Sequence, residues 1–185
     1  DGQPYLIYQD TGGAWHNYGA LPNTGNTAFV TVAAGVGNQN QLQVVCIGKA
    51  DGQPYLIYQD TGGTWHYYGA LPNNGNTAFV TAAAGVGNQN QLQVVCIGKA
   101  DGQPYLIYQD AGGGWHYFGT LPNPSKTPPG SASPTAFASV ATGVGNNKQL
   151  QVICTGLDDG KPSLIYQDPS GGWHGYTPPL TPAFA

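Results

Sequence analysis

Residues 1–50 read DGQPYLIYQDTGGAWHNYGALPNTGNTAFVTVAAGVGNQNQLQVVCIGKA, and residues 51–100 repeat them almost unchanged. The two copies differ only at these pairs of positions: Ala14/Thr64, Asn17/Tyr67, Thr24/Asn74 and Val32/Ala82. A third copy begins at residue 101, and a fourth, more divergent copy ends in LIYQDPSGGWHGY. A period of about 50 residues is typical of solenoids, propellers and other repeat arrays. We therefore expect one domain over 1–185, with repeats at about 1–50, 51–100, 101–158 and 159–185.

Each repeat contains four short apolar or alternating runs separated by turn residues. In the first repeat we expect strands over residues 3–9 (QPYLIYQ), 15–18 (WHNY), 28–34 (AFVTVAA) and 42–47 (LQVVCI). Glycine, proline, asparagine and aspartate lie between these runs, as they do in hairpin loops. No segment has a helical period. The sequence therefore predicts an all-β protein.

Four antiparallel strands in 40–50 residues is about the size of a propeller blade. The small residues of AFVTVAAGVG suit the innermost strand, where blades crowd around an axis, and the aromatic WHNY run suits the outermost strand. The fold class predicted is a β-propeller of four-stranded antiparallel blades, and a β-solenoid is the alternative. The chain holds about three and a half blades, with complete ones at roughly 27–70, 77–120 and 135–178.

The arrangement around these blades leaves the ring open. Three and a half blades do not close well. We therefore expect either that a second copy completes the ring, as a homodimer or higher oligomer, or that the sequence is part of a longer chain. The tail 181–185 resembles the start of another inner strand. The Pro/Ser-rich insertion at 123–134 lengthens the third repeat and is expected to be an exposed loop.

Charge and composition limit the possible partners. Only 8% of the residues are charged, the net charge is −4, and Lys and Arg together number five, so we expect no nucleic acid to bind, because that needs a basic surface. No apolar run is long enough for a membrane helix, so no membrane insertion is expected. A neutral polar surface suits sugars, although it is equally compatible with no ligand at all.

The cysteines give no sign of a disulfide or a metal site. Cys46, Cys96 and Cys154 occupy the same place in successive repeats, which keeps them too far apart to pair. No second ligand lies at a metal-binding spacing from them. We expect buried free thiols, no metal and no cofactor.

The repeated Gly-Gly-x-Trp-His-x-Tyr/Phe motif is the best candidate for a site. The face of an aromatic ring can stack against the C–H face of a sugar, and Gln9, Asp10, Asn38 and Gln39, with their repeats, can supply polar groups. The alternative is that the rings only fill the space between blades and that each histidine is packed and hydrogen-bonded. The sugar-binding residues predicted are Trp15, His16, Tyr18, Trp65, His66, Tyr67, Trp115, His116, Tyr117, Trp173 and His174.

Catalysis is not expected. The repeated aspartates Asp10, Asp60, Asp110 and Asp168 occupy equivalent places, and the chain has no glutamate. Glycoside hydrolysis needs two carboxyl groups in different environments, whereas repetition produces identical ones. No nucleophile motif or phosphate loop is present, so the sequence predicts no catalytic residues.

The pattern QLQVV.IG..DGQPYLIYQD.GG.WH.YG.LPN resembles the bacterial β-propeller lectins of the Photorhabdus type, and the similarity extends over essentially the whole chain. The resemblance implies binding of fucose and related, often O-methylated, sugars in clefts between adjacent blades of a seven-bladed ring, of which this chain is about half. In this chain the implied sites correspond to the Trp-His-Tyr segment and the strand opposite it.

Three functions remain open at this stage. The first is a non-enzymatic, multivalent lectin, secreted or acting at a cell surface, whose partners are fucosylated or methylated glycans. The second is a propeller scaffold for protein partners with purely structural aromatic residues, and the third is a glycosidase. The clefts need not be equivalent, because Asn17 and Gly175 replace the tyrosine found at 67 and 117.

Overall fold

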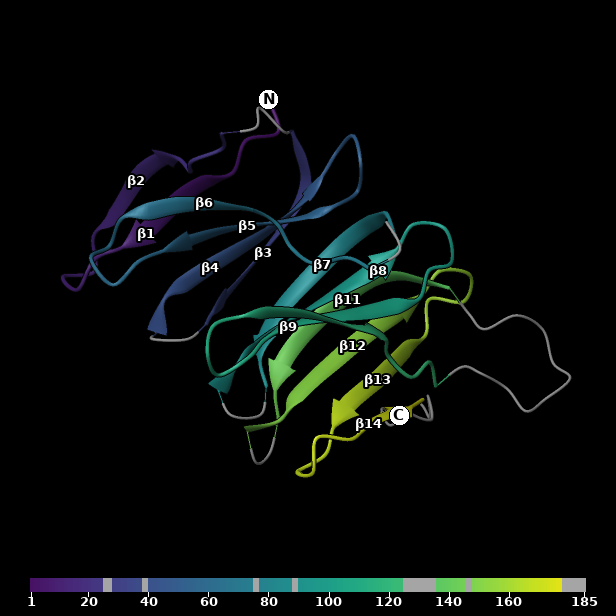
Figure 1. Ribbon diagram of the computed structural model, residues 1–185. Helices are drawn as coiled ribbons and strands as arrows, with labels where there is room; N and C mark the ends of the chain where they lie inside the picture. Colours follow the sequence, from purple (N-terminus) through teal and green to yellow (C-terminus); the bar gives the residue numbers. More distant parts are fainter. Residues whose placement is uncertain are drawn as a thin grey trace, which may run out of the picture.

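The computed structural model describes residues 1–24, 28–37, 40–74, 77–87, 90–124, 136–145 and 148–177. Its regular elements are β-strands, which confirms the all-β prediction (Figure 1). Within the described residues, no helix has the length and apolar character needed to traverse a bilayer. The predicted tail strand at 181–185 and residues 125–134 of the predicted exposed loop lie outside the described residues.

The strands form one two-stranded sheet and three four-stranded sheets, all antiparallel. Sheet 1 contains β1 (Tyr5–Gln9) and β2 (Trp15–Ala20). Sheet 2 contains β3 (Phe29–Val36), β4 (Leu42–Gly48), β5 (Pro54–Gln59) and β6 (Trp65–Ala70). Sheet 3 contains β7 (Phe79–Val86), β8 (Leu92–Gly98), β9 (Pro104–Gln109) and β10 (Trp115–Thr120). Sheet 4 contains β11 (Phe137–Val144), β12 (Leu150–Gly156), β13 (Pro162–Gln167) and β14 (Trp173–Tyr176).

Within each sheet, every strand pairs with the next one along the chain, so each sheet is a simple meander. The outer hairpin closes through a tight turn in which the Asp10 backbone N–H donates to the Ala14 carbonyl and Gly13 has a φ of 86°. The outermost strands β2, β6 and β10 have six residues, are longer than the predicted 15–18 segment and pair through a β-bulge, whereas β14 has four residues and no bulge. In β10 the pairing with β9 passes from Tyr117 to Gly119, which has a φ of 108°, and leaves Phe118 unpaired. Gly119 is required there because other residues rarely adopt this conformation.

The small-residue strands lie innermost, as predicted. β3 packs against β7 and β7 packs against β11, and Figure 1 shows the three in the middle of the molecule, with β2 and β14 toward opposite ends. Glycine makes this close approach possible. A Cβ on Gly35 would overlap the Leu92 side chain, and a Cβ on Gly85 would overlap Leu150.

The hydrophobic core lies between neighbouring sheets. Strands β4, β8 and β12 and their partners β5, β9 and β13 carry apolar residues on both faces. This pattern suits sheets 2 and 3, each of which lies between two other sheets. One face of sheet 2, with Val45 and Leu56, packs against Leu92 and Val94 of sheet 3. We call the face that points toward the next sheet along the chain the forward face, and the opposite one the backward face.

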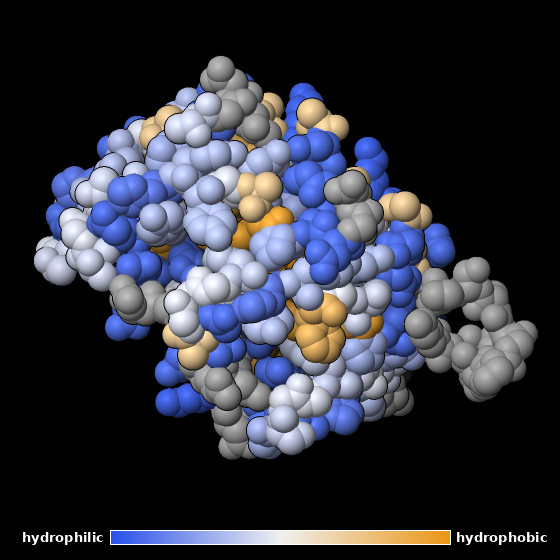
Figure 2. All heavy atoms as spheres, viewed as in Figure 1, coloured by the Kyte–Doolittle hydropathy of each residue, from blue (hydrophilic) through white to orange (hydrophobic). Residues whose placement is uncertain are grey.

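The two ends of the series are not covered. Ile57 and Ile107, on the backward faces of sheets 2 and 3, are fully buried, whereas the equivalent Ile7 in sheet 1 is 65% exposed. On the forward faces, Val45 and Val95 are fully buried, whereas the equivalent Ile153 in sheet 4 is 51% exposed. On the side of the molecule drawn in Figure 2, by contrast, hydrophilic residues dominate and apolar ones form small separate patches.

Candidate functional site

Two clefts open between adjacent four-stranded sheets at equivalent places in the repeat. The cleft between sheets 2 and 3, here called cleft 2/3, has a volume of about 480 Å³. The cleft between sheets 3 and 4, called cleft 3/4, has a volume of about 590 Å³. Both volumes fall in the range of small-molecule sites, and each cleft is lined by nearly the same set of repeat positions.

An aromatic ring from each of the two sheets walls the cleft. In cleft 2/3, Trp115 comes from the backward face of sheet 3, and Tyr58 and Tyr68 come from the forward face of sheet 2. In cleft 3/4 the corresponding residues are Trp173, Tyr108 and Phe118.

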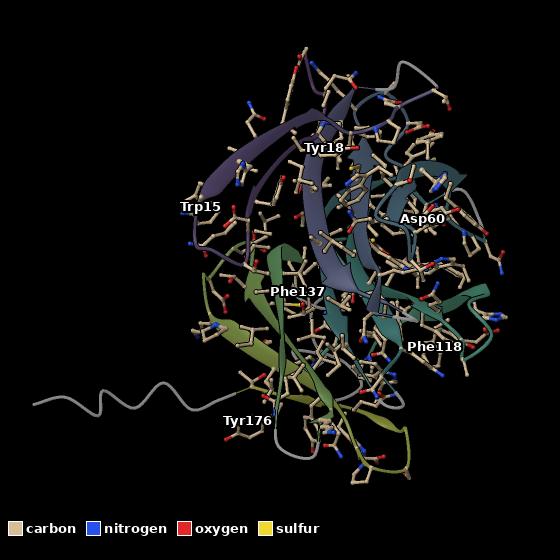
Figure 3. All side chains as sticks on the ribbon, turned by 90° about the vertical axis from the view of Figure 1, so that its left-hand side faces the viewer. Trp15, Tyr18, Asp60, Phe118, Phe137 and Tyr176 are labelled. Carbon is tan, nitrogen blue, oxygen red and sulfur yellow. The ribbon has the colours of Figure 1, made fainter. Side chains whose placement is uncertain are left out.

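The β-bulge explains why the residue after Tyr67 or Tyr117 reaches the cleft. Tyr68 and Phe118 are the unpaired residues of their bulges, and Phe118 is labelled in Figure 3. A bulge turns the side chain of its extra residue out of the regular alternation. Each lines its cleft and stays 55% exposed, so the ring is accessible to a ligand.

Two buried glutamines lie in the wall of each cleft. In cleft 2/3 the Gln43 Nε2 donates to Gln109 Oε1 across the two sheets at 3.3 Å, and Gln109 Nε2 donates to the Gly113 carbonyl at 3.2 Å. Gln43 is only 2% exposed, and its Oε1 has no hydrogen-bond partner among the described residues. A buried acceptor without a partner costs about 1–3 kcal/mol, so the fold keeps this polar group beside the cleft at a cost.

The same arrangement recurs in cleft 3/4. There Gln93 is 4% exposed, donates to Gln167 Oε1 at 3.4 Å, and has an Oε1 with no partner in the described part of the chain. Gly87 provides the space for this side chain, since a Cβ at that position would overlap the Gln93 amide. Gly37 stands in the same relation to Gln43.

The predicted tryptophans occupy three different environments. Trp115 and Trp173 line the clefts. Trp65 is 6% exposed in the core between sheets 1 and 2, and its Nε1–H has no partner among the described residues. Trp15, on the uncovered backward face of sheet 1, is 70% exposed at the outer edge of the molecule (Figure 3).

The predicted tyrosines do not line the two clefts. Tyr67 and Tyr117 point backward and pack against the cores between sheets, where Tyr117 stacks on Tyr105 with ring centroids 6.3 Å apart. Tyr18 lies beside the buried Trp65, with ring centroids 6.5 Å apart. Tyr67 and Tyr117 therefore fit the alternative interpretation of the sequence, in which the aromatic rings fill space between blades.

Each predicted histidine is paired with the aspartate that opens its own hairpin. His116 Nε2 lies 2.6 Å from Asp110 Oδ2, and Asp110 Oδ1 accepts the backbone N–H of Gly114. The histidine ring also stacks on the neighbouring Tyr108, with centroids 5.2 Å apart. The same pairs form in the other repeats, between His16 and Asp10, His66 and Asp60, and His174 and Asp168. The histidines therefore hold the hairpin loop, whose backbone forms one wall of each cleft.

These contacts also shift ionisation. The hydrogen bond from His116 and the backbone N–H groups of the loop lower the pKa of Asp110 below its ordinary value of 3.8. Burial raises the pKa of each thiol, Cys46, Cys96 and Cys154, to about 12. All three cysteines are free and buried, as the sequence predicts.

The polar side chains that line the clefts are only in part the ones that the sequence predicts. Asn38 and Gln39 lie outside the described residues. Gln9 donates to the Gly13 carbonyl within sheet 1, and its equivalents Gln109 and Gln167 line the clefts. The residues missed were Gln43 and Gln93, whose only signal is a polar residue within an otherwise apolar strand, LQVVCI. In the described ranges no group of three His, Cys, Asp or Glu side chains is arranged to hold a metal ion.

Comparison with known proteins identifies the fold. No family model matches the chain, and no curated protein matches it. Among solved structures, a fungal lectin from Aleuria aurantia, described as a six-bladed β-propeller with a novel fucose recognition mode, is 16% identical, with a TM-score of 0.65 over 97% of this chain and 53% of that one. The chain therefore spans about half the length of that lectin.

Two enzymes have a similar fold. An exo-β-1,3-galactanase from Clostridium thermocellum is 10% identical over 94% of this chain and 40% of that one, with a TM-score of 0.58. A family 117 glycoside hydrolase from Zobellia galactanivorans is 12% identical over 97% and 61%, with a TM-score of 0.55. Together with the sheets described above, these likenesses confirm a β-propeller architecture of about three and a half blades.

Proposed function

We propose that this protein is a carbohydrate-binding lectin without enzymatic activity, whose clefts between sheets bind monosaccharides such as fucose or O-methylated sugars. The observation that carries the proposal is the pairing, in each cleft, of an accessible tryptophan with a buried glutamine oxygen that lacks a partner. Sugars need both, because one face of the ring is apolar and the hydroxyl groups need neutral acceptors and donors.

The fold of the similar proteins supports this proposal. One mutant of the Aleuria aurantia lectin is found in complex with α-methyl-L-fucoside in one structure and with Fucα1-6GlcNAc in another. Those chains are only 18% identical to this one, so the sugar itself remains open between fucose and its methylated relatives. The resemblance to the Photorhabdus-type lectins stays a prediction.

Hydrolysis is less well supported by the clefts. Neither cleft is lined by an aspartate, and the chain contains no glutamate. A glycosidase needs two carboxyl groups beside the scissile bond. The nearest aspartates, at the start of each hairpin, are already engaged by a histidine and by the loop backbone.

The decisive experiment compares tryptophans at one repeat position. Trp173→Ala and Trp115→Ala should each abolish binding of methyl α-L-fucoside to one cleft, whereas Trp15→Ala, which removes a ring that faces no other sheet, should leave it unchanged. Calorimetry and ligand-observed NMR measure the binding. If the unmodified protein binds no sugar on a glycan array, the lectin proposal fails and a protein-binding scaffold is favoured. Release of fucose from a fucoside would favour the glycosidase.

We also propose that the lectin is multivalent and self-associates. Equivalent clefts on one rigid body raise the affinity for a dense glycan surface by about 10²–10⁴ over a single site. The uncovered faces at Ile7 and Ile153 are apolar surfaces of the kind that the chain covers internally with another sheet. A second copy provides such a sheet.

A further inference from the structure

One residue distinguishes the two clefts by charge. Among the described residues, Lys148 is the only charged residue that lines cleft 3/4, and none that lines cleft 2/3 is charged. Within the described residues, none of the ion pairs includes Lys148; the lysine that does form one is Lys161, with Asp159. Cleft 3/4 thus presents an ammonium group to a ligand while the protein as a whole has a net charge of −4.

The backbone at Lys148 is unusual for a lysine. Its φ is 58°, in the left-handed region, and the equivalent positions in the other repeats are occupied by Asn40 and Asn90, with φ values of 57° and 58°. Asparagine tolerates this conformation, whereas a long side chain does so at a local cost. The repeat therefore carries a lysine at a position that favours asparagine, and strain of this kind occurs most often at functional sites.

Asp168, whose carboxylate opens the loop at the wall of the cleft, forms no ion pair with Lys148 among the described residues. Asp168 Oδ1 accepts hydrogen bonds from Ser170 and from the Gly172 backbone N–H, and its Oδ2 lies 2.7 Å from His174 Nε2. These contacts, with the Ser170 hydroxyl first, lower the pKa of Asp168. Asp168 itself is not among the residues that line the cleft.

The aromatic walls differ in the same direction. Cleft 2/3 has the Tyr68 hydroxyl, which can bond to a neutral sugar hydroxyl, whereas cleft 3/4 has Phe118 in its place. Cleft 3/4 also has the Ser170 hydroxyl where cleft 2/3 has Gly112, but that hydroxyl donates to Asp168. The charged group that cleft 3/4 gains is the Lys148 ammonium. In a cleft with partly apolar walls, a single charge acts more strongly on an anion than it would on an open surface.

We propose that cleft 3/4 prefers a sugar bearing a carboxylate, a hexuronic acid, and that cleft 2/3 has no such preference. This rests on the proposed lectin function and assigns a second ligand class to one of its sites. The sugar ring packs against Trp173, and the carboxylate pairs with the Lys148 ammonium group. Because this pair is partly solvated, the gain over the matched neutral sugar is about two- to five-fold.

A probe that reports each cleft separately tests this. The chain has four tryptophans, so labelling with 5-fluorotryptophan gives four ¹⁹F signals, which single Trp→Phe variants assign. Methyl β-D-glucuronide and methyl β-D-glucoside, which differ in one carboxylate, are then titrated. The Trp173 signal should shift at a two- to five-fold lower concentration of the glucuronide, and raised salt should remove that difference. The Trp115 signal should show no such preference.

Variants complete the test. Lys148→Asn, which installs the residue found at 40 and 90, should bring the ratio of the two concentrations at Trp173 to one. Lys161→Asn, which removes a lysine outside the cleft, should leave the ratio as it is. The proposal is overturned if glucuronide has no advantage at Trp173, or if methyl α-L-fucoside shifts Trp173 and glucuronide does not. If no sugar shifts either tryptophan, the lectin function itself fails.

Discussion

Each repeat has a tryptophan at the same place in the motif, and the sheet that faces this tryptophan sets its role. Trp115 and Trp173 are accessible beside clefts, Trp65 is buried, and Trp15 is exposed at the end of the molecule. Sheet 1 lacks the inner two strands, and the clefts contain buried glutamines that come from the β4 and β8 positions of a complete sheet. A complete site therefore forms only against the forward face of a complete four-stranded sheet.

Trp65 gives a stability test at the residue scale. Trp65→Ala should lower the free energy of unfolding by about 3–5 kcal/mol, as expected for a large buried ring. Trp65→Phe should cost only about 1 kcal/mol, because it also removes a buried N–H that lacks a partner among the described residues. Urea-induced unfolding measures both. An equal loss for the two variants would show that the indole N–H is bonded in solution.

The aspartate–histidine pairs predict a pH dependence. The folded-state pKa of Asp110 is lowered by the bond to His116, below the ordinary 3.8 of the unfolded chain, so the pair stabilises the fold above about pH 4. This contribution should be lost as the pH falls through the lowered pKa, when the carboxylate is protonated.

The thermal midpoint of Asp110→Asn measures this contribution. It should lie below that of the unmodified protein at pH 7, and the difference should shrink as the pH falls through the lowered pKa of Asp110. The variant His116→Gln serves as the control, since it removes the same contact by changing the histidine in place of the aspartate. A difference between Asp110→Asn and the unmodified protein that is constant from neutral to acid pH would contradict this account.

At the scale of the strand and its turns, glycines decide where the cleft side chains lie. The bulge at Gly119 directs Phe118 toward the cleft, and Gly87 leaves room for Gln93 at the wall. Sequence alternation alone identifies neither, because a bulge breaks the alternation and a buried glutamine looks like any polar residue in a strand.

Gly87→Ala tests the second of these roles. The added methyl group would overlap the Gln93 amide, so the fold should lose about 1–3 kcal/mol from overpacking. Sugar binding at cleft 3/4 should weaken by about two- to ten-fold, as for the loss of one hydrogen bond. Unfolding curves and the Trp173 ¹⁹F signal report the two effects.

Gly143→Ala is the matched control. Gly143 lies in β11, has no atom within 4 Å of an added Cβ, and has no left-handed φ. Its replacement should leave sugar binding unchanged. If Gly87→Ala binds sugar as well as Gly143→Ala does, Gln93 has no part in the site.

At the scale of the whole molecule, the two end sheets each expose an apolar face that no other sheet covers. Ile107 is fully buried and Ile7, its equivalent in the first repeat, is 65% exposed. Ile107→Ala should cost about 2–5 kcal/mol at any protein concentration. Ile7→Ala should cost less than about 0.5 kcal/mol in a dilute, monomeric sample.

Self-association makes a further prediction about Ile7. If a second copy covers sheet 1, the cost of Ile7→Ala should grow with protein concentration, because association adds to apparent stability by mass action. Unfolding at about 1 µM and about 100 µM, with native mass spectrometry of the same samples, measures this. A monomeric mass at both concentrations would refute the proposed second copy.

The 50-residue repeat by itself determined the all-β class, the four-stranded sheets and the order of small and aromatic strands. These follow from local signals: turn residues set the hairpins, and side-chain size sets the distance of a strand from the axis. It also located the two cleft tryptophans, because Trp115 and Trp173 lie in the most distinctive motif of the repeat.

Only the tertiary structure decided which copies of that motif form a site. Repeated residues are identical in sequence, and their difference arises from the neighbouring sheet, which contributes the opposite wall and the buried glutamine. The histidines differ in this respect, because their aspartate partners lie six residues away across one hairpin and the pair forms in every repeat. A pattern in the chain defines the side chains that are available, but burial and hydrogen bonding depend on atoms brought together from distant parts of it.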